Sequence, residues 1–147
     1  MLMATTALAE PQGTNVAARL DRVSVQMVHT GVVFKCGITI DNPTGRLFTA
    51  TNLFSMPPGL ALRVMDLDGH ELARVFAFPW KMWRFPIAPG SGQWTNLWYG
   101  GKIVREGIAG VVLAENMRAV RVQIEGTLSG SGYTNRVKSN VVQVSVP

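Results

Sequence analysis

The chain has 147 residues, with 14 Lys and Arg against 9 Asp and Glu, and a single cysteine, Cys36. This length predicts one domain, which is large enough to form a core without a disulfide or metal staple. One cysteine excludes an internal disulfide framework and an all-cysteine zinc site. No apolar run approaches the ~20 residues of a membrane-spanning helix, and the 47% hydrophobic content argues against global disorder.

Residues 1–15 are expected to form a flexible leader or the remnant of a signal peptide. Ala7, Leu8 and Ala9 match the small-x-small pattern that precedes a signal-peptidase site, but no basic residue starts the stretch. If the leader is a signal remnant, the protein is extracytoplasmic or secreted. If it is not, the protein is cytoplasmic, and the sequence leaves both open. The folded domain is expected to span residues 16–147.

Alternation of apolar and polar residues dominates that domain, which is the signature of half-buried β-strands. Residues 120–125 (VRVQIE) alternate cleanly, and Phe34, Cys36 and Ile38 share one face of another run. A turn sequence at 66–69 (DLDG) predicts a hairpin. Strands are expected near 20–29, 31–40, 46–54, 60–66, 70–78, 92–99, 108–113, 118–127 and 137–146. This spacing indicates an all-β fold, a single antiparallel β-sandwich of seven to nine strands, immunoglobulin-like and without a disulfide.

The side chains that most enzymes and metal sites require are scarce. His29 and His70 are the two histidines, and they are far apart in the sequence. The chain has no nucleophile elbow and no glycine-rich phosphate loop. Asp66 and Asp68 resemble the start of a calcium loop, but the closing glutamate of an EF-hand is missing, so a plain turn is favoured. We therefore expect no catalytic residue, no metal site and no cofactor, and hence a protein that is not an enzyme.

Aromatic residues gather in one part of the chain, and all four tryptophans lie between residues 80 and 98. Lysine and arginine are interleaved with them. Tryptophan beside arginine is typical of the anchors of protein interfaces. The alternative is that these rings fill the core between two sheets. The candidates for partner binding are Trp80, Lys81, Trp83, Arg84, Trp94, Trp98 and Tyr99.

Four short segments, in order, carry a resemblance to a known family: residues 38–44 (ITIDNPT), 62–72 (LRVMDLDGHEL), 87–90 (IAPG) and 137–144 (VKSNVVQV). With these segments the chain resembles bacterial immunoglobulin-like β-sandwich modules and is loosely similar to BsuPI-type proteinase-inhibitor domains. The resemblance implies the sandwich fold over residues 20–146. It transfers no site, because the tryptophan-rich segment has no counterpart and no inhibitory loop can be matched.

The leading hypothesis for function is a non-enzymatic protein-binding or structural module that uses sheet edges and the tryptophan-rich segment. Its partner would be another protein or a second copy of the chain. The first alternative is a nucleic-acid-binding or virion-type β protein, which the net charge of +5 allows but the scattered basic residues do not favour. The second alternative, from the resemblance, is a protease inhibitor.

Overall fold

The computed structural model describes residues 16–51, 60–78, 84–100, 103–104, 107–108, 110–130 and 133–147. All the regular secondary structure in these ranges is β-strand. The expected leader, residues 1–15, lies outside them, so its assignment as a signal remnant stays a prediction. Across the described ranges, no helix is long and apolar enough to cross a lipid bilayer.

One sheet of the fold has four strands in the order β2-β3-β9-β7. Their bounds are Ala17–Val28 for β2, Gly31–Asn42 for β3, Ser91–Tyr99 for β9 and Ala77–Phe78 for β7. The two long strands β2 and β3 form a hairpin in which Val28 pairs with Gly31, so His29 and Thr30 make the tip. A register shift between Leu20 and Arg22 marks a bulge in β2.

The second sheet is organised around β12 (Ala119–Gly130), the long strand that pairs with four others. Its path runs β6-β5-β12-β4-β8, and β13 and β14 pair with the other edge of β12. The bounds are Phe48–Thr51 for β4, Ala61–Met65 for β5, Glu71–Val75 for β6, Arg84–Ile87 for β8, Tyr133–Lys138 for β13 and Val142–Ser145 for β14. A separate two-stranded ribbon pairs β10 (Ile103–Val104) with β11 (Gly107–Ile108).

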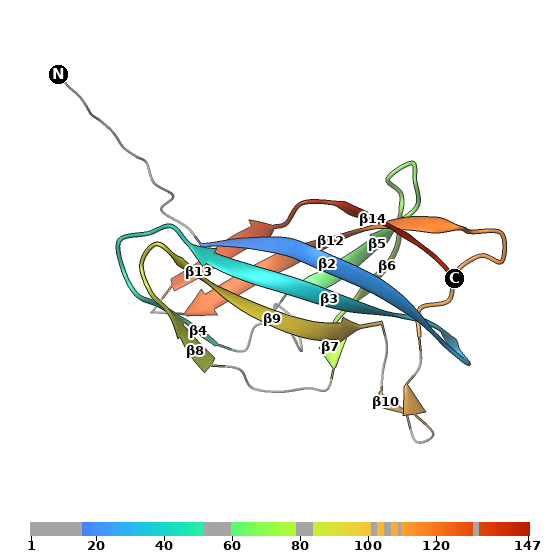
Figure 1. Cartoon of the computed structure of the whole chain (residues 1–147), viewed down its shortest axis with the longest axis horizontal. Helices are drawn as coiled ribbons and strands as arrows, with labels where there is room; N and C mark the ends of the chain where they lie inside the picture. The colour runs from blue at the N-terminus through green and yellow to red at the C-terminus, as the bar shows by residue number, and fades with distance from the viewer. Residues whose placement is uncertain are drawn as a thin grey trace.

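The two large sheets pack face to face, with β2, β3 and β9 side by side in one layer and β12, β5 and β13 in the other (Figure 1). The core between them is built from the apolar positions of the alternating strands, such as Phe34, Ile38, Leu62 and Ile124, all of which are fully buried. The predicted all-β antiparallel sandwich is therefore confirmed. Within the described ranges the two large sheets have eleven strand segments, four in one and seven in the other, which is more than the seven to nine strands expected.

The prediction of a single strand over residues 137–146 is wrong, because β13 ends at Lys138 and β14 begins at Val142. In the gap, Ser139 binds β12 through its side chain: the Ile124 N–H donates to Ser139 Oγ (2.8 Å). Asn140 reaches the other sheet, since it accepts from the Leu20 N–H (2.8 Å) and donates to the Leu20 carbonyl (3.1 Å). This side chain thus links the two layers at the β2 bulge.

A second difference concerns β8 (Arg84–Ile87), which falls between the strands expected at 70–78 and 92–99. This strand pairs antiparallel with β4, with Phe48 opposite Ile87. Pro86 does not alternate in polarity with its neighbours and cannot donate a backbone hydrogen bond, which is why the segment gives no strand signal.

Candidate functional site

The outer face of the sheet β2-β3-β9 carries the tryptophan side chains that the structure describes. Along β9, Thr95, Leu97 and Tyr99 are buried, whereas Trp94 is 53% exposed and Trp98 is half-buried. Successive side chains of a strand point to opposite faces. Trp94 and Trp98 therefore share the face that points away from the core, about 13 Å apart along the strand.

The predicted site residues have different fates. Trp80, Lys81 and Trp83 lie outside the described residues. Arg84 is exposed, but it lies on β8 in the other sheet, so the fold does not bring it to the Trp94 face.

Tyr99 requires a correction as a partner-binding candidate, because its side chain is completely buried in the core. Its side chain points from β9 into the core, and its backbone partner on β3 is Phe34. Its hydroxyl donates to the Leu60 carbonyl (3.4 Å). Burial raises the pKa of this hydroxyl well above its ordinary value.

Strand register brings residues from β2 and β3 beside the tryptophans. Arg22, Gly37 and Asn96 form one row across the three strands. The next row is Ser24, Lys35 and Trp98. No local pattern in the sequence identifies Arg22, Gly37, Lys35 or Asn96, because strand pairing decides which residues of different strands face each other.

Gly37 explains how the Trp94 ring is held. A Cβ atom at this position would lie 3.1 Å from Trp94 Nε1 and 3.4 Å from its Cζ2. The indole therefore leans across β3 and rests where Gly37 has no side chain. Among the residues whose side chains the structure describes, no other Phe, Tyr or Trp ring is exposed to the same degree.

Lys35 and Arg22 give this face its free positive charge. The Lys35 ammonium lies 5.4 Å from the centroid of the Trp98 ring, within the range of a cation–π interaction. Arg22 is exposed and makes no ion pair with any residue in the described ranges. We refer to Arg22, Lys35, Trp94, Asn96 and Trp98 as the tryptophan face.

The carboxylates near this face are already engaged. Arg19 donates to Asp21 (2.6 Å) and to Asp41 (3.2 Å), and the Thr39 hydroxyl donates to the other oxygen of Asp21. The hydrogen bond to Asp41 and the charges of both carboxylates raise the pKa of Arg19. Asp21 and Asp41 are thus both paired with Arg19, and within the described ranges neither makes an ion pair with Arg22 or Lys35.

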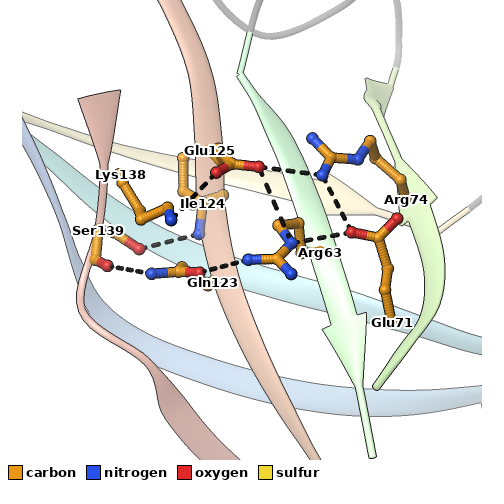
Figure 2. Close-up of polar contacts among 8 residues, drawn as sticks. All are labelled: Arg63, Glu71, Arg74, Gln123, Ile124, Glu125, Lys138 and Ser139. Atoms are coloured by element: carbon orange, nitrogen blue, oxygen red, sulfur yellow. Dashed lines mark hydrogen bonds and ion pairs between the residues drawn. The ribbon is translucent and has the colours of Figure 1, made fainter. Parts of the chain in front are cut away.

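The opposite outer face, on β5, β6 and β12, has a different chemistry (Figure 2). Arg63 donates to Glu71 (2.8 Å) and to Gln123 (3.0 Å). Arg74 donates to Glu71 and to Glu125, both at 2.9 Å, and Lys138 lies 3.4 Å from Glu125. Here each carboxylate meets at least two cations.

The pKa values of both glutamates are lowered by this arrangement. For Glu71 the main cause is the hydrogen bond from Arg63, followed by the one from Arg74. For Glu125 burial raises the pKa, but the hydrogen bonds from Arg74 and Lys138 and the nearby positive charges outweigh it. The network therefore joins β5 and β6 to β12 and β13 and engages both glutamates. Arg121, on the same face of β12, is exposed and makes no ion pair within the described ranges.

Asp66, Asp68 and His70 belong to the turn between β5 and β6, and their polar groups bind one another there. Asp66 Oδ1 accepts from the backbone N–H groups of Asp68 (2.9 Å) and His70 (2.8 Å), and Asp66 Oδ2 lies 3.1 Å from His70 Nδ1. The backbone bond from His70 is the main cause of the lowered pKa of Asp66. These bonds shape the predicted hairpin between β5 and β6, so the carboxylate is occupied by its own turn.

Cys36 is a core residue, as its place on the apolar face predicts. It is fully buried, and burial raises the pKa of its thiol to about 12. A thiol with that pKa is almost entirely protonated at neutral pH and is a poor nucleophile.

Comparisons with known proteins add no further constraint. No protein-family model and no curated protein sequence matches the chain.

Proposed function

We propose that the protein is a non-enzymatic binding module that docks a partner protein on the tryptophan face. The observation that carries this proposal is the exposed Trp94 ring, held over Gly37 on a three-stranded surface. An exposed tryptophan on a rigid element supplies a large apolar contact at little entropic cost, and tryptophan with arginine dominates binding energy at protein interfaces.

The surroundings of Trp94 support an interface more than an isolated surface ring. Asn96 lies two residues from Trp94 on β9, and Arg22 of β2 lies in the same cross-strand row as Gly37 and Asn96. Neither side chain has a hydrogen-bond partner among the described residues. Their donors and acceptors are thus available to a partner. Because the strands fix the relative positions of these groups, binding would require little reorganisation of the module.

Photo-crosslinking tests this proposal. The photoreactive residue p-benzoylphenylalanine replaces Trp94 in one variant and Leu72, an exposed residue of β6 in the other sheet, in a matched variant. We expect the residue-94 probe to capture a specific protein in the cells that make the chain, and the residue-72 probe not to capture it. The captured protein, once purified, is expected to bind the wild-type chain in a titration. Equal capture from both positions, or no binding of the purified protein, would remove the proposal.

A further inference from the structure

We infer that the segment bound on the tryptophan face is acidic and extended, with carboxylates that pair with Arg22 and Lys35. This inference rests on the proposed function and specifies the chemistry of the partner. It follows from the charges of the face, the spacing of its two free cations and the exposure of the ring beside them.

The tryptophan face has more positive than negative charge. Both carboxylates of this face, Asp21 and Asp41, are bound by Arg19. Arg22 makes no ion pair within the described ranges, although Asp21 precedes it in the chain, and the Lys35 ammonium lies over the ring of Trp98. The local surplus beside the tryptophans is therefore positive, and a complementary partner would carry negative charge there.

The distance between Arg22 and Lys35 matches the side-chain repeat of an extended peptide. Arg22 pairs with Gly37, and Lys35 lies two residues from Gly37 on β3, so Arg22 and Lys35 are diagonal neighbours. Their Cα atoms are about 7–8 Å apart in such a pair. Alternate side chains of an extended peptide repeat at about 6.7 Å. Acidic residues two apart in an extended segment would therefore meet both cations at once.

The exposed ring of Trp94 lies close to the row that contains Arg22. Trp94 lies across β3 on the Gly37 side, which is the row of Arg22. A partner whose carboxylate reached Arg22 would cover the exposed surface of this ring with the rest of the segment. Covering the ring removes water around the ion pair, which strengthens it compared with a fully exposed pair.

The test uses a short fluorescent peptide in which Glu and Thr alternate, with a Gln–Thr peptide and a Lys–Thr peptide of the same length as controls. Anisotropy is measured with the wild-type chain, with Arg22→Gln and with Arg121→Gln. Arg121 is a matched control, because it is exposed and has no ion pair among the described residues but lies on β12, in the other sheet.

We expect the Glu–Thr peptide to bind more tightly than both control peptides. Arg22→Gln should weaken it by about two- to fivefold, as expected for one partly exposed ion pair, and Arg121→Gln should leave it unchanged. Binding should also weaken as salt rises. Equal binding of the Glu–Thr and Gln–Thr peptides, or equal effects of the two arginine changes, would overturn the inference.

A single-stranded oligonucleotide is the other arm of the experiment. If it binds more tightly than the Glu–Thr peptide, and Arg22→Gln weakens that binding, the inference of an acidic peptide ligand is wrong and the ligand is a nucleic acid. The inference can also fail while the proposed function stands. That result would be a purified partner that needs Trp94 but contacts the face with a segment free of Asp and Glu.

Discussion

The two outer faces of the sandwich use similar residues to different ends. On β5, β6 and β12, arginine and lysine are matched to glutamate in a network that links the strands (Figure 2). On β2, β3 and β9, Arg22 and Lys35 have no carboxylate partner among the described residues, and Trp94 is exposed beside them. The network face engages both of its glutamates with cations, whereas the tryptophan face combines two cations, unpaired within the described ranges, with an exposed tryptophan.

This contrast separates stability from binding. A residue of the network face should matter for the free energy of unfolding and leave partner affinity unchanged. A residue of the tryptophan face should show the reverse.

Trp94→Ala should give the largest effect on binding. The loss of a central aromatic anchor costs about 2 kcal/mol of binding free energy, or roughly a 30-fold higher Kd for the purified partner. The free energy of unfolding should fall by less than about 1 kcal/mol, because about half of the ring is already exposed.

Leu72→Ala is the matched control for this change, since Leu72 is 43% exposed and lies in the other sheet. Its affinity for the partner should equal that of the wild-type chain. A loss of stability from Trp94→Ala that accounts for the whole loss of binding would place the ring in a structural role.

Asn140→Ala should give the largest loss of stability among these polar changes. It removes both hydrogen bonds to the Leu20 backbone and leaves those groups without their partner, at a cost of about 1–3 kcal/mol. Denaturant unfolding measures the loss. Partner affinity should stay constant at temperatures where the variant is folded, and a change in affinity would show that the β2 bulge shapes the tryptophan face.

Glu125→Gln should lower the free energy of unfolding by about 1–2 kcal/mol, because charge-assisted hydrogen bonds are replaced by a neutral one. Glu115→Gln is the control, since Glu115 is exposed and its carboxylate has no ion pair in the described ranges. The control should be neutral. If both changes cost the same, the network contributes nothing beyond general charge balance.

The contribution of the network should depend on pH. The folded-state pKa of Glu125 lies below its ordinary value of 4.5, so its stabilisation is fully present above pH 4.5 and is lost as pH falls through the folded-state pKa. The gap in unfolding free energy between the wild-type chain and Glu125→Gln should therefore be constant near neutral pH and close in acid. A gap that widens in acid would contradict this assignment.

Gly37→Ala should give the smallest effect. The added methyl group would press on Trp94 Nε1 at 3.1 Å and tilt a ring whose far side is free to move. We expect partner affinity to fall by about threefold, a change of under 1 kcal/mol, with little change in stability. No change in affinity would show that the resting position of the ring is not important for binding.

Alternation predicted most of the strands and the core. The buried set Phe34, Cys36 and Ile38 follows directly from period two, and the hairpin at 66–69 follows from its turn residues. The break at Ser139 was missed because a polar side chain there replaces a backbone partner of β12. Local patterns do not reveal such substitutions.

The site was only partly predictable. Crowding of aromatic residues pointed to residues 80–99 but grouped Tyr99 with Trp94 and Trp98. The alternation of β9 alone would have separated them, since the side chain of Tyr99 points to the same side of the strand as that of Leu97. Arg22 and Lys35 could not be found, because register between distant strands depends on the whole fold.

The most direct test of the contrast between the faces is hydroxyl-radical footprinting of the complex with the purified partner. It reports the exposure of individual side chains, and Trp94 and Leu72 provide one exposed reporter for each sheet. The account predicts that oxidation of Trp94 falls on complex formation while that of Leu72 stays constant. Unchanged oxidation of Trp94, with protection at Leu72, would place the interface on the network face and contradict the account.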